Sequence, residues 1–186
     1  MKSIMSIEYR MFQKSARVLF VKRYPMNGQT PVRTISKKTK YGLQSLIALA
    51  RRYSEGPVLI AKLAKDEDIP IKFLELILLD LKNSGLLESK KGPGGGYLLS
   101  RPPSQITIGS VIRFMEGPLA PLPCASETAY RPCEECKDVD CCGTRIVMRE
   151  VRDAMARILD GTTLLDVVQR VDAAKHLKEA VLTYEI

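Results

Sequence analysis

The sequence predicts a mainly α-helical fold with a small β wing, in which a winged helix-turn-helix module precedes a long C-terminal helix. Three observations predict this fold. Apolar residues recur at intervals of three and four through residues 39–53, and two shorter helical segments follow. A glycine-rich tip at residues 92–96 separates two short strand-like segments. An apolar stripe with helical period returns at residues 145–159.

The first three predicted helices form the helix-turn-helix. The first, residues 39–53, has an apolar face of Tyr41, Leu43, Leu46, Ile47, Ala50 and Tyr53. The second, residues 58–64, is short and is stopped by an acidic turn at residues 66–68. Pro70 suits the first turn of a third helix, and Gly85 lies just past its end. Its predicted core face is Ile71, Leu74, Ile77, Leu78 and Leu81.

The wing is predicted from residues 86–89 and 97–100 as strands. The intervening glycines and Pro93 exclude helix and suit a tight hairpin whose tip lies close to another surface. Lys90 and Lys91 precede the tip, so this basic hairpin suggests contact with a phosphate backbone or a minor groove. An ordinary surface loop is the alternative.

The second half of the chain is predicted to hold three more helices. One covers residues 108–115, with Thr107 or Ser104 as its N-cap. The long helix at residues 145–159 ends at Asp160-Gly161, and Thr162 or Thr163 caps a last short helix at residues 164–168. Residues 172–186 show no clear period.

Charge is divided unevenly along the chain. Residues 1–35 carry a net charge of +6 and residues 36–103 a net charge of +5, whereas residues 104–186 carry −3. The first half therefore suits nucleic acid, and the second half does not. No apolar run approaches the roughly 20 residues that span a bilayer, so we expect a cytoplasmic protein without a membrane partner. The glycine tip lacks the Gly-Lys-Ser/Thr ending of a phosphate-binding loop, which argues against a phosphate-binding enzyme.

Several polar residues of the module point to DNA. Lys72, Glu75, Leu79 and Lys82 face outward on the third helix, where lysines can contact phosphates and a glutamate can accept from the cytosine amine. A solvated Lys/Glu face is the common alternative. The order of the features decides: a basic start (Lys37, Lys38, Lys40), a helix-turn-helix and then the Lys-Lys-Gly-Pro-Gly-Gly-Gly-Tyr hairpin. Together they predict DNA binding.

The segments Ser36–Tyr41, Phe73–Glu75, Lys82–Leu86 and Gly92–Leu99 resemble the IscR-type (Rrf) family of bacterial winged-helix transcription regulators. The similarity extends from about residue 36 to about residue 171. It implies a homodimer on a palindromic operator in double-stranded DNA, with a repressor expected. The helix at residues 145–159 would be the dimer element.

The resemblance also implies roles for individual residues. Glu75 would read a base, and Lys91 would reach into the minor groove beside the wing. Leu76 stands where many relatives have a polar residue. The full set of expected DNA contacts is Lys37, Lys38, Lys40, Tyr41, Lys72, Glu75, Lys82, Lys91, Pro93 and Gly94.

Five cysteines lie within nineteen residues: Cys124, Cys133, Cys136, Cys141 and Cys142. Their neighbours are acidic, whereas buried structural cysteines usually stand singly among aliphatic residues. Clustered thiolates favour an iron–sulfur cluster or zinc. The spacing alone leaves both open.

The resemblance implies a [2Fe-2S] cluster held by three cysteines of this loop, with zinc or no metal as alternatives. The best-known relatives supply a histidine three residues after the last cysteine, where this chain has Arg145, which stays protonated and cannot ligate. His176 is the only histidine. We expect Cys124, Cys133 and Cys142 as ligands with Cys136 as the fourth; Cys141 or a carboxylate are the other choices. Cluster binding or loss would reorder the loop beside the dimer helix, in response to iron, oxygen or nitric oxide.

Two other functions compete with this hypothesis. The same regulator could sense thiol oxidation or zinc without a cluster. A redox enzyme using Cys133-x2-Cys136 lacks the strand–helix context of that motif, so we expect no enzyme.

The chain is expected to hold four parts: a poorly ordered basic extension (1–35), a winged helix-turn-helix DNA-binding domain (36–103), a cysteine loop and dimerisation region (104–171) and a C-terminal tail (172–186).

Overall fold

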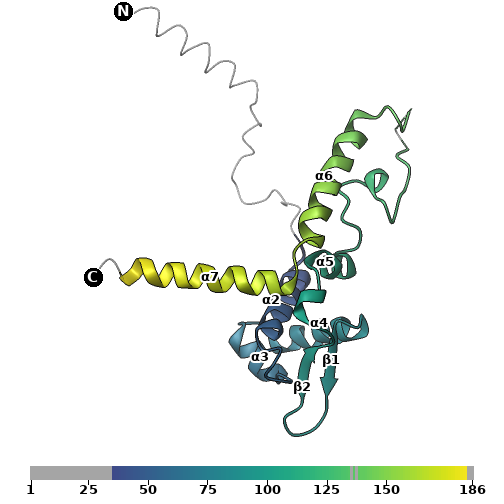
Figure 1. The fold of residues 1–186 in the computed structure, drawn as a ribbon. Coiled ribbons are helices and arrows are strands. Elements are labelled where there is room, and N and C mark those ends of the chain that lie inside the picture. Colours follow the sequence, from purple (N-terminus) through teal and green to yellow (C-terminus); the bar gives the residue numbers. More distant parts are fainter. Residues whose placement is uncertain (1–34, 135, 137, 184–186) are drawn as a thin grey trace, which may run out of the picture. The chain divides into compact units, whose positions relative to one another are not determined.

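The computed structural model describes residues 35–134, 136 and 138–183, with side chains described up to residue 179. These residues belong to one structural unit that begins at Ile35. The expected N-terminal extension lies outside them, apart from its last residue. Figure 1 shows the elements, which are α2 (Lys37–Arg51), α3 (Ile60–Asp66), α4 (Ile71–Asn83), β1 (Leu87–Lys90), β2 (Gly96–Leu99), η1 (Pro103–Gln105), α5 (Ile108–Glu116), η2 (Pro123–Ala125), α6 (Gly143–Asp160) and α7 (Leu164–Thr183). Within the described part, no helix combines the length and apolarity needed to cross a membrane.

Helix α2 begins two residues earlier than predicted and also ends two residues earlier. The Ser36 hydroxyl accepts a hydrogen bond from the Thr39 N–H and so caps the helix. Lysines occupy the first turn, which is why the apolar period did not reveal this start. Tyr53, predicted on the buried face, is exposed because the helix has already ended at Arg51.

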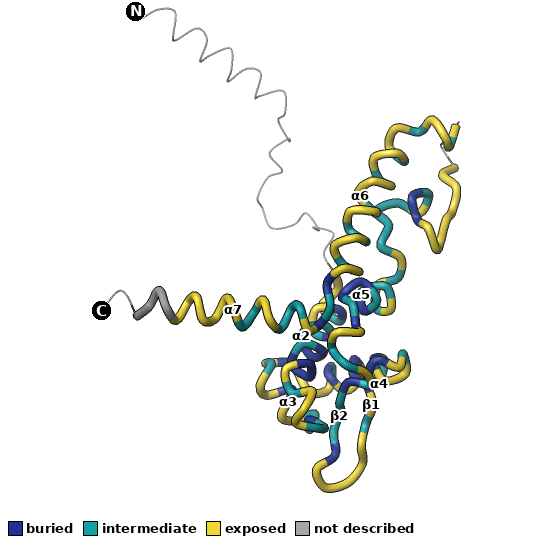
Figure 2. Tube along the Cα trace, viewed as in Figure 1, coloured by how far each residue is buried: buried dark blue, intermediate teal, exposed yellow. Residues whose placement is uncertain are grey.

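The core is formed by the winged helix-turn-helix elements together with α5 and the start of α7. Helices α2, α3 and α4 pack together, and the predicted core face of α4 is confirmed at its four fully buried positions, Leu74, Ile77, Leu78 and Leu81. Ile71 was predicted in this face but is 40% exposed, because the packed part of α4 starts only at Leu74. Figure 2 shows buried residues concentrated in these elements and in α5, and exposed or half-buried ones along α6.

The wing is an antiparallel pair in which Leu87 lies opposite Leu99 and Lys90 opposite Gly96, one residue shifted from the predicted strands. A third segment joins it. Val58, predicted at the start of the second helix, instead exchanges two backbone hydrogen bonds with Tyr97, of 2.8 and 2.9 Å. Gly96 has a φ of +149°, and a Cβ there would overlap the Val58 carbonyl. This close approach explains the glycine.

The tip of the wing is a tight turn. The Gly95 N–H donates to the Gly92 carbonyl at 2.9 Å, with Pro93 second in the turn and Gly94 third at a φ of +75°. Proline at the second position and a positive φ at the third are the features of a type II turn. The tip is therefore a defined hairpin turn.

The second half of the unit joins the module through a short backbone bridge. Ile108 N–H donates to the Thr162 carbonyl at 2.8 Å, and Leu164 N–H donates to the Ile106 carbonyl at 2.9 Å. Thr107, rather than Ser104, caps α5 by accepting from the Ser110 N–H. Beyond it, α6 begins at Gly143, two residues earlier than predicted, with Cys142 as its N-cap.

The last helix is longer than predicted. Thr163 and Asp166 exchange backbone and side-chain hydrogen bonds at its start, as in a capping box. Helix α7 then continues to Thr183 instead of stopping near residue 168. It packs on α2, where Arg51 lies 3.6 Å from Asp172, but residues 173–179 are exposed. A helix with so little buried surface shows no apolar period, which is why the pattern missed it.

Candidate DNA-contact surface and cysteine loop

The outward side of α4 carries the predicted polar residues. Lys72, Glu75 and Lys82 are all exposed. The Lys72 ammonium lies 3.2 Å from the nearer Glu75 carboxylate oxygen, an exposed pair three residues apart on the helix. Exposed pairs of this kind contribute little to stability, so both groups are free to exchange partners.

The predicted residues of α2 fall into two groups. Lys37 and Lys40 are exposed. Lys38 instead forms an ion pair with Asp80 of α4 at 2.5 Å, and the half-buried Tyr41 ring packs edge-on against Phe73 with 5.7 Å between ring centroids. In this structure, Lys38 and Tyr41 hold α2 against α4.

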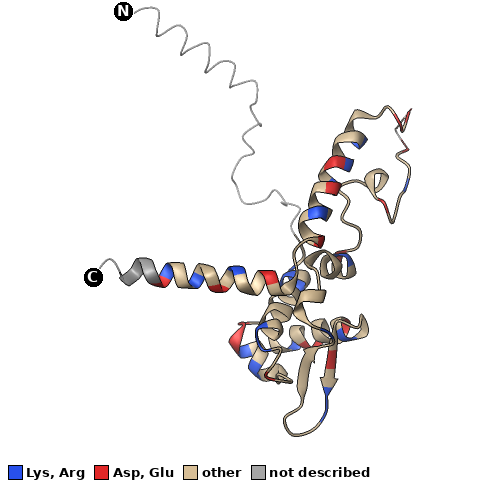
Figure 3. Ribbon diagram, in the orientation of Figure 1, with Lys and Arg blue, Asp and Glu red and all other residues tan. Residues whose placement is uncertain are grey.

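The wing tip presents backbone and basic side chains together. Lys90, Lys91, Gly92, Pro93 and Gly94 are all exposed. Figure 3 shows basic positions at the wing end of β1. Because the glycines carry no side chains, the tip can approach another surface closely, with its lysines beside the point of contact.

The cysteine loop brings two of the four predicted ligands together. The thiols of Cys136 and Cys142 share a hydrogen bond, which raises the pKa of Cys136. The pKa of Cys142 is lowered, first by a hydrogen bond from the backbone N–H of Arg145 and then by one from the Cys136 thiol. The backbone N–H is available because Cys142 lies at the N-terminus of α6. Cys133 and Cys141 are exposed and Cys124 is half-buried.

Arg145, which stands where the family resemblance implied a histidine ligand, organises this loop. Its Nε donates to the Cys124 carbonyl at 3.0 Å and its Nη1 to the Val139 carbonyl at 3.4 Å. The guanidinium also lies over the Tyr130 ring, 5.9 Å from the centroid. One side chain thus joins the beginning of the loop to its end. From the sequence, Arg145 was only excluded as a ligand, and this role was not predicted.

The donor chemistry of the loop suits a thiolate-bound metal group, but the described thiols do not yet surround one point. Among the described residues, no three His, Cys, Asp or Glu side chains gather as a metal site. Cys136 and Cys142 are in contact, whereas the Cys124 backbone is held by Arg145. A four-cysteine site needs Cys124 and Cys133 to move towards this pair.

Helix α6 lies between the loop and the module with one apolar side uncovered. All of its residues, Gly143–Asp160, are described, and none of them is buried. Val147, Val151, Ala154 and Ile158 are exposed at spacings of four, three and four, which places them on one face. On another side, the Arg152 Nη1 donates to the Ala125 carbonyl at 2.8 Å and holds η2.

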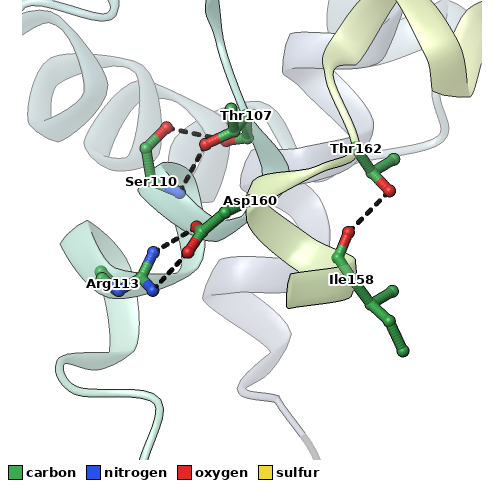
Figure 4. Close-up of polar contacts among 6 residues, drawn as sticks. All are labelled: Thr107, Ser110, Arg113, Ile158, Asp160 and Thr162. Atoms are coloured by element: carbon green, nitrogen blue, oxygen red, sulfur yellow. Dashed lines mark hydrogen bonds and ion pairs between the residues drawn. The ribbon is translucent and has the colours of Figure 1, made fainter. Parts of the chain in front are cut away.

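Two contacts made by charged side chains of α5 were not predicted from the sequence. Arg113 of α5 faces Asp160, the last residue of α6. Its Nη1 donates to one carboxylate oxygen and its Nη2 to the other (Figure 4). Glu116, the last residue of α5, accepts from the Ser36 N–H at 2.8 Å and from the Thr39 hydroxyl. No local pattern signals these contacts because the partners are far apart in the chain.

Comparison with known proteins gives consistent matches. The model of a family described as Rrf2, iron-dependent transcriptional regulator, matches residues 35–170. An rrf2-like HTH-type transcriptional regulator of Rhodobacter capsulatus is 39% identical over 148 residues, which are 78% of this chain and 99% of the relative. The HTH-type transcriptional regulator CymR of Bacillus subtilis is 34% identical over 150 residues, 81% and 98% of the two chains.

Solved structures agree. That of CymR, described as the global cysteine regulator of B. subtilis, matches with a TM-score of 0.63 at 33% identity, covering 75% of this chain and 98% of that one. IscR of T. potens matches with a TM-score of 0.61 at 28% identity, covering 76% and 90%.

Proposed function

Because the chain belongs to the Rrf2 family of DNA-binding transcriptional regulators, we propose that it represses transcription as a homodimer on a palindromic operator, and that its cysteine loop senses the signal. The family and the winged-helix fold expected from the sequence are thereby confirmed. The relatives carry the names of regulators, not of enzymes. The contact residues, the dimer and the cofactor are the parts that we add.

The DNA-contact surface is assigned to α4 and the wing. The observation that carries it is the exposed wing tip, where Lys90 and Lys91 stand beside a turn without side chains. The tip suits a phosphate backbone or a minor groove, and the outward Lys72, Glu75 and Lys82 suit the major groove. Lys37 and Lys40 extend this basic surface along α2.

The test uses duplexes that the full chain enriches from a random double-stranded library. Lys91→Ala should weaken binding and lower the slope of log K against log salt by about 1 per protomer, and so by about 2 for the proposed homodimer, because one phosphate contact is lost in each half-site. Glu75→Ala should relax sequence preference at one position in each half-site. Lys178→Ala, an exposed lysine on α7, is the matched control. Unchanged affinity and slope in Lys91→Ala would overturn the assignment of the wing.

The homodimer is assigned to α6. A helix with an uncovered apolar face signals a partner, and a second copy of the same face gives a closed two-fold pair. Two-fold pairing also presents two recognition helices to half-sites one helical turn apart.

The sensor is assigned to the cysteine loop, with a [2Fe-2S] cluster as the proposed occupant. Cys124, Cys133, Cys136 and Cys142 would hold it, and when bound it supplies a redox-active centre that oxidants can remove. Arg145 keeps the two ends of the loop close, and its N–H favours the thiolate of Cys142. Anaerobic purification, with visible spectra and with iron, sulfide and zinc analysis, tests the cofactor; a colourless protein loaded with zinc would refute it.

A regulator that senses thiol oxidation or zinc is the second candidate, because Cys136 and Cys142 are already in contact while the described residues hold no three-ligand group. Substitution of single cysteines by alanine separates the two. Cys124→Ala abolishes the absorbance of a four-cysteine cluster, but it leaves a response that needs only Cys136 and Cys142.

A change in the loop has a continuous set of contacts through which to reach the DNA surface. Arg145 lies at the start of α6, and Asp160 at its end holds Arg113 of α5. Glu116, at the end of α5, binds the first turn of α2. We assign the coupling between loop and module to these contacts.

A further inference from the structure

The exposed side of α4 carries apolar as well as polar residues. Leu76 is 60% exposed and Leu79 48%. A single exposed leucine on a protein surface is ordinary. Two large aliphatic side chains on the outward side of one 13-residue helix, whose opposite face is fully buried, are not explained by the core.

Helical spacing places the two leucines among the outward polar residues of α4. Leu76 is four residues after Lys72 and three before Leu79, so the three side chains are neighbours on the helix surface. Glu75 precedes Leu76 directly, and both lie in the second turn of α4. In helix-turn-helix proteins the first turns of the recognition helix meet the base edges.

The charges around the apolar patch, Leu76 and Leu79, indicate which partner it suits. Lys72 and Lys82 are exposed on the same helix, and Lys90 and Lys91 are exposed on the wing. A second copy of this face would bring like charges together, whereas DNA supplies opposite charge. The major groove also contains an apolar group that a leucine can cover, the C5-methyl of thymine.

We propose that Leu76 is a specificity-determining residue that contacts a thymine methyl in each half-site, beside the base read by Glu75. The inference rests on the proposed role of α4 as the DNA-contact helix. It adds that the operator carries thymine at a defined position and that the methyl group, not only the base pair, is recognised.

The test replaces single thymines of a library-selected duplex by deoxyuridine, which removes the methyl group and keeps the base pairing. At one position per half-site, deoxyuridine should weaken binding of the wild-type chain about fourfold, the effect of one buried methyl-sized group. Leu76→Ala and Leu76→Gln should bind the thymine and deoxyuridine duplexes equally. Leu177→Ala, which truncates a 69% exposed leucine on α7, should keep the full difference.

The outcomes are distinguishable. If wild-type binding is insensitive to deoxyuridine at every position, or if Leu76→Ala keeps the fourfold difference, the methyl contact is wrong while DNA reading by α4 stands. If Leu76→Ala instead changes the oligomeric state and leaves the thymine preference, the patch is a protein interface. If neither Glu75→Ala nor Leu76→Ala alters binding to the selected duplexes, α4 is not the contact helix and the proposed surface itself fails.

Discussion

Arg113 and Asp160 form a two-point ion pair between α5 and the end of α6, with Nη1–Oδ1 at 2.5 Å and Nη2–Oδ2 at 2.8 Å. The hydrogen bonds raise the pKa of Arg113 and lower the pKa of Asp160. Gly109 lies against the pair, where a Cβ would overlap the Asp160 carboxylate. The contact joins α5 to the helix that carries the cysteine loop.

Asp160→Asn should therefore destabilise the protein by about 0.2–1 kcal/mol, the range of exposed ion pairs. Because the pKa of Asp160 is lower in the folded state, the contribution is complete above the unfolded pKa of about 4 and is lost as the pH falls through the folded value. Urea unfolding at pH 7 and at acid pH measures it. An equal difference between wild type and variant at both pH values would contradict the ion pair.

Glu116 stabilises the start of α2 through hydrogen bonds that also lower its pKa. Its pKa is lowered by hydrogen bonds with the Ser36 and Thr39 side chains and with the Ser36 N–H. Glu116→Ala should cost about 1 kcal/mol of unfolding free energy at pH 7, because a helix N-terminus loses a charged acceptor. Glu116→Gln, which keeps a neutral acceptor, should recover part of the loss. The effect of Glu116→Ala should shrink as the pH falls below about 4.

Gly96→Ala should damage the wing, because the new methyl group meets the Val58 carbonyl and because the backbone has a positive φ. We expect a loss of about 2–3 kcal/mol and weaker DNA binding. Gly94→Ala is the control: its φ is also positive, but no described atom lies near the position of its Cβ. It should cost about 1–2 kcal/mol from the backbone alone. Equal losses in the two variants would show that the Val58 contact is unimportant.

Arg145→Lys should release the cysteine loop. A lysine keeps the charge but cannot donate to the Cys124 and Val139 carbonyls in the same planar arrangement. Losing one of the two hydrogen bonds is worth about 1 kcal/mol, so amide hydrogen exchange in residues 126–141 should accelerate roughly fivefold. Arg149→Lys, at an exposed position one turn further along α6, should leave exchange unchanged.

Val151→Glu should separate the proposed dimer, because it places a charge in the middle of the exposed apolar face of α6. Sedimentation equilibrium should report a monomer, while the far-ultraviolet circular dichroism stays that of the wild type. Glu150→Lys changes a neighbouring exposed charge and should remain dimeric. A monomeric wild type would refute the assignment outright.

Much of this fold was predictable from local signals. The 3.6-residue period located α4 and the middle of α6, and the glycines and proline of the tip located the wing. Errors arose where the local signal was weak. Lysines in the first turn hid the start of α2, Val58 was assigned to a helix instead of a strand-like bridge, and α7 lacked a period because most of its surface is exposed.

Local sequence was enough to predict the order of the elements, the wing turn, the outward lysines and the grouping of five cysteines. These features follow from backbone preferences and side-chain periods that act over a few residues. Three contacts became visible only in the folded chain: Arg113 meets Asp160, Glu116 binds the first turn of α2, and Arg145 holds both ends of the loop. The partners in these contacts lie 21 to 80 residues apart along the chain, so they meet only after the helices have packed.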